Sequence, residues 1–376
     1  MKKFILLLVL VPFLCFTQIL SAEAMFSPTW GFFIDLPEGY EYVDGDAKDR
    51  FSFSGPDGLM FDLVIYNRRF DTMLDLVEDV NRRIQNRGDV DFFRYNNKQA
   101  VIMKLNFGDF DGWGLAVELE SASPIKPMLL ALAYGPAVRK DLEIFHISAL
   151  DSIAPSAAER RYPGPIMEYS FPRGQLKNTR MFNGINAMIY ENDAEASQVL
   201  IEREYLLCQY YLNTPFLQDA CIRYYRFIYR DSFDRIKFAT NAIIQNFSGY
   251  SANTPQEKRA FAQRVLSYIQ GFKYERFVVE SDFLNLVTSI TEGRGDCDSH
   301  AMLFAIILAN VDIRSAIMIS HYYGHSMGLA DLQGAGARFE AHGTQWLVAE
   351  TTSKVDLGLI AEDESDPQHW YAIIFE

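Results

Sequence analysis

Short runs of alternating apolar and polar residues, typical of half-buried strands, fill the chain from Phe26 to Ala154. Turn residues separate the runs, as Pro56-Asp57-Gly58 does between the first two. Stretches 72–85 and 137–153 instead repeat apolar residues at helical spacing. The expected strands are residues 51–54, 59–66, 99–107, 113–119 and 127–134. The pattern predicts a small α+β domain over residues 25–155.

Four prolines between Pro155 and Pro172 mark a boundary, after which the pattern changes. Residues 193–246 are rich in helix formers and aromatic residues, with breaks expected at Asn213-Thr214-Pro215 and near Asp231. The many tyrosines of this stretch recur at helical intervals, which favours packing over ligand binding. We therefore expect a helical connecting region over residues 156–250 that docks one domain on the other.

The third part, residues 251–376, opens with the helix start Thr254-Pro255-Gln256-Glu257, and that helix should run to about residue 271. Further on, residues 301–310 are apolar on every side, as expected of a helix buried in a domain centre. Strand character follows at 313–320, 325–332, 345–351 and 370–375. A buried helix followed by consecutive strands predicts a second α+β domain.

Composition narrows the classes of protein to consider. The 376 residues are 49% apolar and 14% aromatic, which is enough for two or three packed cores and too rich for disorder. The net charge is −14 and no basic stripe offsets it, which argues against nucleic acid as a partner.

The first 24 residues resemble a secretory signal peptide in their order. Lys2-Lys3 precede an apolar run over residues 4–16, and Ala22-Glu23-Ala24 supplies small residues for cleavage. The run is shorter than the ~20 residues that a membrane span needs, although an N-terminal anchor is the alternative. We expect a periplasmic or secreted protein, cut near Ala24, with no membrane span in the mature chain.

The four cysteines differ in their expected roles. Cys15 lies in the signal segment, whereas Cys208 and Cys221 lie 13 residues apart in the helical region. These two could form an intramolecular disulfide across a helical hairpin, or they could be buried free thiols. Cys297 has no obvious sulfur partner, which suggests a chemical role.

Cys297 is placed to be a nucleophile. Capping by Gly295 or Asp296 puts it in the first turn of a helix, where unpaired N–H groups and the helix dipole favour a thiolate. Asp296 and Asp298 oppose this effect, so a cationic partner is required. Histidine is the usual one, because it stabilises the thiolate and then protonates the leaving group.

His325, which follows Gly324 at a strand start, is the preferred base, with His321 as the weaker candidate. A third group must orient the imidazole. Asp331 is six residues farther along the same strand, about 20 Å away. Glu350 ends an apolar run that should form the neighbouring antiparallel strand, so it is the expected partner of His325.

These residues resemble a known family. Gly295-Asp296-Cys297-Asp298, the strand start at Gly324-His325 and the run Trp346 to Thr352 are similar to the transglutaminase-like superfamily, in its bacterial cysteine-peptidase branch. Residues 268–270 and Tyr274 also match a helix-to-loop pattern of that branch. The resemblance implies a papain/transglutaminase-like core and a Cys297–His325–Glu350 triad. Residues 31–40, GFFIDLPEGY, are similar to the start of PsbP/Mog1-like domains.

Two departures from the family pattern concern activity. The family's acid is commonly Asp, and Glu350 is one methylene longer. No tryptophan occurs between Trp113 and Trp346, so the indole that stabilises the oxyanion in true transglutaminases is missing. The backbone N–H of Cys297 and the side chain of Gln270 are the expected replacements, with Asp296 as support.

The resulting hypothesis is a thiol enzyme that attacks peptide or protein amide bonds through a thioester, needing no metal and no cofactor. Three alternatives stay open. The domain could be an inactive form of the same fold, or a module that binds a peptide without catalysis. Cys297-x-x-His300 with His321-x-x-x-His325 also has the spacing of a Cys/His zinc site, although a long helix separates the two halves.

Overall fold

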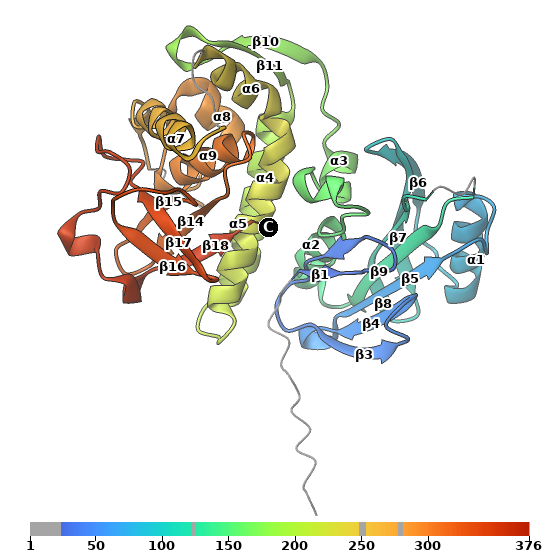
Figure 1. Ribbon diagram of the computed structural model, residues 1–376. Coiled ribbons are helices and arrows are strands. Elements are labelled where there is room, and N and C mark those ends of the chain that lie inside the picture. The colour runs from blue at the N-terminus through green and yellow to red at the C-terminus, as the bar shows by residue number, and fades with distance from the viewer. Residues whose placement is uncertain (1–23, 122–124, 248–252, 277–280, 376) are drawn as a thin grey trace, which may run out of the picture.

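The computed structural model describes residues 24–121, 125–247, 253–276 and 281–375, and the chain is mixed α+β, as predicted. Its first part contains a seven-stranded antiparallel sheet in the order β3-β4-β5-β9-β8-β7-β6 (Figure 1). A short pair, β1 (Met25–Phe26) and β2 (Phe33–Ile34), precedes the sheet. The sheet strands are β3 (Glu41–Gly45), β4 (Arg50–Ser54), β5 (Met60–Tyr66), β6 (Val90–Tyr95), β7 (Lys98–Phe107), β8 (Phe110–Glu118) and β9 (Met128–Pro136).

Both faces of this sheet are covered, because neighbouring side chains of a strand point to opposite sides. Along β7, Val101 packs with Leu76 of α1 (Met73–Ile84). The next residue, Ile102, packs with Leu150 of α2 (Glu143–Asp151). A capping box at Thr72, whose side chain accepts from the N–H of Asp75, starts α1 at the predicted place.

All five strands predicted for this part are present, but β3 and β6 were missed. These two are the edges of the sheet, and most of their residues are exposed or half-buried, so their apolar pattern is weak. The helix predicted over residues 137–153 is wrong in its first half. A 3-10 turn at Lys140–Leu142 comes first, and α2 starts only at Glu143.

The middle part is not wholly helical, contrary to the prediction. After α3 (Pro165–Ser170) comes a hairpin of β10 (Leu176–Arg180) and β11 (Asn186–Tyr190). Then follow α4 (Asp193–Tyr210), α5 (Leu217–Arg235) and α6 (Lys237–Asn246). The break at Asn213-Thr214-Pro215 is present, and the break expected near Asp231 comes five residues later, at Ile236 between α5 and α6. The Asp231 carboxylate is buried and accepts from Arg235 Nε at 2.8 Å, one turn later in the same helix.

The last part surrounds one buried helix, α9 (Cys297–Ala309), between α7 (Pro255–Ile269), α8 (Leu286–Glu292) and a five-stranded sheet in the order β16-β17-β15-β14-β18. The sheet strands are β14 (Ser315–Ser320), β15 (His325–Ala330), β16 (Arg338–Ala341), β17 (Thr344–Ala349) and β18 (Tyr371–Ile374). Two short strands, β12 (Lys273–Tyr274) and β13 (Arg294–Gly295), pair in parallel. The edge strand β16 was not predicted.

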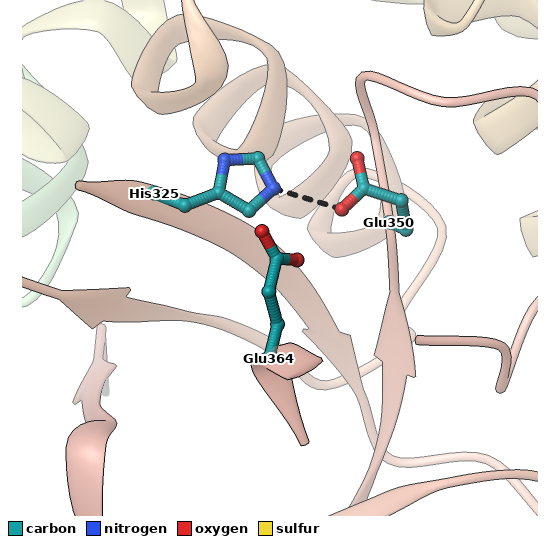
Figure 2. Close-up of side chains that lie close together, drawn as sticks. All are labelled: His325, Glu350 and Glu364. Atoms are coloured by element: carbon teal, nitrogen blue, oxygen red, sulfur yellow. Dashed lines mark hydrogen bonds and ion pairs between the residues drawn. The ribbon is translucent and has the colours of Figure 1, made fainter. Parts of the chain in front are cut away.

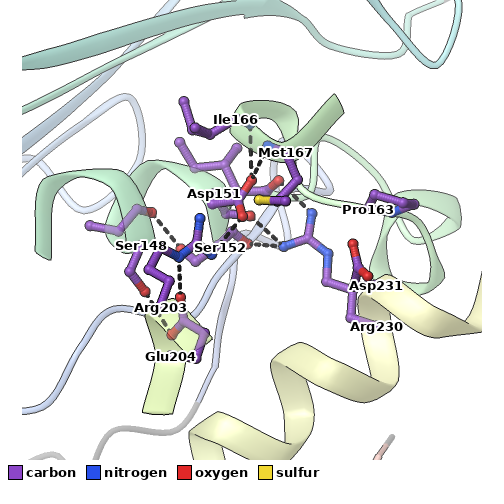
Figure 3. A network of polar contacts seen from close by, with 12 residues as sticks. Ser148, Asp151, Ser152, Pro163, Ile166, Met167, Arg203, Glu204, Arg230 and Asp231 are labelled. Carbon is purple, nitrogen blue, oxygen red and sulfur yellow. Dashed lines mark hydrogen bonds and ion pairs between the residues drawn. The ribbon is translucent and has the colours of Figure 1, made fainter. Parts of the chain in front are cut away.

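Helices α4 and α5 lie between the two sheets (Figure 1) and share an apolar cluster with α7, α9 and the C-terminal sheet. On their other side, a polar network joins them to the N-terminal part (Figure 3). Arg203 Nη2 contacts Asp151 Oδ2 at 2.7 Å, and Arg223 Nη2 donates to Ser148 Oγ at 2.8 Å. Arg230 donates to the backbone carbonyls of residues 151–153, each at 2.8 Å.

Two further predictions concern the termini and the cysteines. The expected signal peptide, with Cys15, lies outside the described residues except for Ala24. Among the helices that the structure describes, none is both long enough and apolar enough to cross a membrane. Cys208 and Cys221 do face each other across the α4–α5 hairpin, but as free thiols with their sulfurs 3.0 Å apart.

Candidate active site

Cys297 is the first residue of α9, as the sequence predicts. Asp296 caps the helix, because its Oδ1 accepts from the N–H of Ser299 at 2.7 Å while Ser299 Oγ accepts from the N–H of Asp296 at 3.0 Å. The first N–H groups of a helix have no carbonyl partner within the helix. The backbone N–H of Cys297 is one of these groups. Only 4% of Cys297 is exposed, so its thiol sits where the helix dipole acts without much screening by water.

The fold brings His325 and Glu350 together. His325 begins β15, and Glu350 follows the last residue of β17, the neighbouring antiparallel strand. His325 Nε2 and Glu350 Oε2 are 2.8 Å apart (Figure 2). Gly328 allows α9 to lie against β15, because a Cβ there would come within 2.5 Å of Phe304 Cδ1.

The Cys297 thiol also acts on the imidazole. Since Nε2 is engaged by Glu350, Nδ1 is the ring nitrogen left for the thiol. Burial by itself lowers the pKa of His325, but the Cys297 thiol, the hydrogen bond to Glu350 and the Glu350 charge outweigh it and raise the pKa to about 10. His325 is therefore an imidazolium at neutral pH, held between a thiol and a carboxylate.

Glu350 is fixed by more than its histidine. Its Oε1 accepts from the backbone N–H of Thr352 at 2.6 Å and from the Thr352 hydroxyl at 2.5 Å, and Ser353 N–H lies at 3.2 Å. Burial favours the neutral acid, but His325 and these donors favour the anion and leave the pKa of Glu350 lowered. A buried carboxylate with this many donors keeps one orientation, and so does the imidazole bonded to it.

Gln270 supports Glu350 in a way that the sequence did not predict. Its Nε2 donates to the backbone carbonyl of Glu350 at 2.8 Å and to that of Val355 at 2.9 Å. Both amide hydrogens are therefore used, and Gln270 can donate to an oxyanion only by giving up one of these bonds. The Cys297 N–H stays as the predicted donor, and the hydroxyl of Tyr274, whose pKa is raised by burial and by the Cys297 charge, is a second candidate.

The pKa of each acidic neighbour of Cys297 is raised in the folded protein. Burial and the nearby Asp298 raise the pKa of Asp296 to about 8. Burial likewise raises the pKa of Asp298. A carboxyl group that is protonated near neutral pH repels a thiolate much less than an ionised one does. The opposition to a thiolate that the sequence predicted from Asp296 is thus reduced by the fold, and the raised pKa of Asp298 acts in the same direction.

The remaining sequence candidates lie elsewhere. His300 is buried beside the rings of Phe272 and Tyr274, and burial lowers its pKa to about 4. His321 bonds to Tyr371, with Nε2 2.9 Å from the hydroxyl. Asp331 pairs with Arg314 at 3.0 Å, away from His325 as expected.

One acid near the histidine was missed from the sequence. Glu364, in a 3-10 turn at Glu362–Glu364, directs its carboxylate toward the imidazole (Figure 2). His325, Glu350 and Glu364 form the only group among the described residues that could hold a metal ion, with ligand atoms within 4.8 Å of one another. Neither His300 nor His321 belongs to it. Only the acidic run at residues 362–364 could have suggested Glu364.

The chain matches no protein-family model and no curated protein.

Proposed function

We propose that residues 251–376 form a transglutaminase-like thiol domain that attacks peptide or protein amide bonds. One observation carries the proposal: a cysteine that begins a buried helix acts on the pKa of a histidine, and the Nε2 of that histidine lies 2.8 Å from a buried carboxylate. Nucleophile, base and orienting acid in that order define the general form of a thiol triad. The helix that bears Cys297 and the antiparallel strands after it are the arrangement expected of a papain/transglutaminase-like core.

In this mechanism, the Cys297 sulfur attacks the carbonyl carbon and a tetrahedral oxyanion forms, stabilised by the Cys297 N–H. His325 then gives its Nδ1 proton to the leaving nitrogen, the C–N bond breaks, and a thioester remains on Cys297. Attack on the thioester by water gives hydrolysis, and attack by an amine gives transamidation. Glu350 keeps the imidazole oriented throughout and stabilises its cationic form.

The expected location and layout complete the proposal. We propose a protein exported by a signal peptide cut near Ala24 to the periplasm or the exterior. Its N-terminal domain, residues 25–155, would be PsbP/Mog1-like, and residues 156–250 would connect the two domains. Mass spectrometry of the native protein tests the export, since the chain should then begin at or near Met25.

Iodoacetamide labelling at mildly acidic pH tests the thiol chemistry. The double variant Cys208→Ser/Cys221→Ser leaves Cys297 as the one cysteine after the signal segment. We expect rapid labelling of this variant, and none once Cys297→Ala is added. His325→Gln in the same background should slow labelling at least ~10-fold, because the imidazolium that stabilises the thiolate is lost. Labelling at the rate of a small free thiol, unchanged by His325→Gln, would contradict the proposal.

A second candidate function follows from the cluster of His325, Glu350 and Glu364, which offers one nitrogen and two carboxylate ligands. Zinc accepts such a set. The direct bond between His325 and Glu350 favours the triad, because an ion between these side chains would replace that bond. The two functions respond oppositely to a chelator. It should leave the labelling of a triad unchanged and should increase the labelling of a metal site, in which the ion withdraws His325 from the thiol.

A further inference from the structure

A second thiol–histidine cluster lies away from Cys297. Cys208 of α4 and Cys221 of α5 face each other, and His321 follows β14. The two sulfurs are 3.0 Å apart, and His321 acts electrostatically on the Cys221 thiol. The proposed mechanism at Cys297 uses none of these three residues.

His321 is held in place by a hydrogen bond and is also exposed to solvent. Its Nε2 lies 2.9 Å from the hydroxyl of Tyr371 on β18, and the two rings are in contact. Cys221 is 7% exposed, whereas His321 lies at the surface. The histidine therefore links the buried sulfur to solvent and can carry its proton outward.

The two thiols are not equivalent. The hydrogen bond from Cys208 and the contact with His321 outweigh burial and lower the pKa of Cys221 to about 6. The hydrogen bond to Cys221 and burial raise the pKa of Cys208, and the nearby carboxylates Glu204 and Glu38 add to the rise. In such a pair the proton is shared, and the sulfur next to the histidine is the one that ionises first.

We propose that Cys221 and Cys208 form a thiol–disulfide exchange site, with Cys221 as the attacking thiol, His321 as its base and Cys208 as the resolving thiol. The substrate class is a disulfide of a small molecule or of another protein. A sulfur separation of 3.0 Å exceeds a covalent bond of ~2.05 Å, so a small movement of α4 against α5 closes the pair.

The exchange balances in two steps. The Cys221 thiolate, whose proton passes to His321, attacks the substrate disulfide, so that one S–S bond forms, one breaks and a first thiolate leaves. Cys208 then attacks the Cys221 sulfur, the Cys208–Cys221 bond forms, the mixed disulfide between Cys221 and the substrate sulfur breaks, and that sulfur leaves as the second thiolate. The protons of the two cysteines end on the two released thiols. The substrate disulfide gains the two electrons that the dithiol loses.

The first test uses oxidised glutathione on the reduced full-length protein carrying Cys297→Ser, so that the outcome is independent of the proposed active site. Samples are quenched with acid, alkylated and mapped by mass spectrometry. We expect an intramolecular Cys208–Cys221 disulfide. Adding Cys208→Ser should trap a glutathione adduct on Cys221, and adding Cys221→Ser should leave Cys208 at least ~10-fold less reactive. A Cys208 that reacts as fast as Cys221, or no adduct in the Cys208→Ser protein, would overturn the proposal.

The second test separates a base from a structural role for His321. Cys221 alkylation is followed against pH in the Cys297→Ser/Cys208→Ser protein, with and without His321→Gln. The charged or titratable groups around the pair are Cys208, Glu204, Glu38, His321 and Tyr371, and Asp298 acts on the histidine. His321→Gln should move the midpoint of the profile to higher pH and slow the reaction below it. The exposed His342→Gln should change neither. An unmoved midpoint in His321→Gln would show that the histidine is not the base.

Discussion

The histidines of the two cysteine–histidine pairs lie at opposite ends of one turn. His321 and His325 flank residues 322–324, which connect β14 to β15. At one end, Cys297 is the first residue of its helix, and its histidine is bonded to the carboxylate of Glu350. At the other, Cys221 lies in the second turn of α5, and its histidine is bonded to the phenol of Tyr371. The same two residue types therefore sit in different electrostatic surroundings.

The group next to each histidine determines which reaction the cysteine–histidine pair can support. A carboxylate behind the imidazole stabilises its cation through a whole acyl-transfer cycle, which a neutral phenol does not. A second sulfur at 3.0 Å, in contrast, offers Cys221 a resolving partner that Cys297 lacks. We infer that the third group, rather than the cysteine–histidine contact, separates acyl transfer from disulfide exchange.

The largest effect should come from removing each thiol in turn. Cys297→Ser should lower amide turnover by at least ~10³-fold, since a triad fails when its nucleophile is lost. Cys221→Ser should leave turnover within about twofold, because that thiol does not contact the triad. Steady-state kinetics on a substrate that the wild-type protein processes gives both values. Equal losses of amide turnover in the two variants would contradict the separate roles given to Cys297 and Cys221.

The next largest effect should come from changing the group that is bonded to each histidine, Glu350 at His325 and Tyr371 at His321. Glu350→Gln should reduce turnover by about 10²-fold or more, because the amide orients the imidazole without stabilising its charge. Tyr371→Phe removes the corresponding group from His321 and should change turnover little. The circular dichroism spectrum of each variant controls for folding. A larger loss in Tyr371→Phe than in Glu350→Gln would contradict the assignment of roles.

A smaller effect should appear in stability against pH. The pKa of His325 is raised to about 10, against ~6.5 in the unfolded chain, so its contribution is complete below about pH 6.5 and is lost as pH rises through about 10. Glu350, whose pKa is lowered, is ionised throughout this range. Glu350→Gln should therefore cost about 2 kcal/mol near pH 6.5 and clearly less near pH 10. Urea unfolding at the two pH values checks this, and a cost that grows with pH would show the opposite linkage.

The smallest effect concerns the hydroxyl that holds Glu350. Thr352→Val removes its 2.5 Å bond to Glu350 Oε1 and should cost about 1 kcal/mol of folding free energy. Thr351→Val is the matched control, because the buried Thr351 hydroxyl has no hydrogen-bond partner among the residues that the structure describes. That variant should be neutral or slightly stabilising. Thermal unfolding compares the two, and a greater loss in Thr351→Val would contradict the role given to Thr352.

The sequence was a good guide to elements with a strong local pattern and a poor one at sheet edges. The α7 and α9 starts could be predicted because their capping residues lie within a few positions of the helix. The edge strands β3, β6 and β16 could not, because an edge strand needs no apolar alternation. The helix continues past Asp231 to Arg235, because the Asp231 carboxylate is paired with Arg235 one turn later, and the break comes at Ile236.

The sequence by itself determined that Cys297 begins a buried helix, because glycine, cap and apolar run are adjacent in the chain. It also pointed to His325 and Glu350, since strand order and parity bring them within reach. Only the tertiary structure decided that Gln270 holds the Glu350 backbone, that Glu364 approaches the imidazole, and that His321 belongs to Cys221. These contacts join residues from tens of positions to 100 apart, and their geometry follows from how the helices and sheets pack as a whole, which no local pattern records.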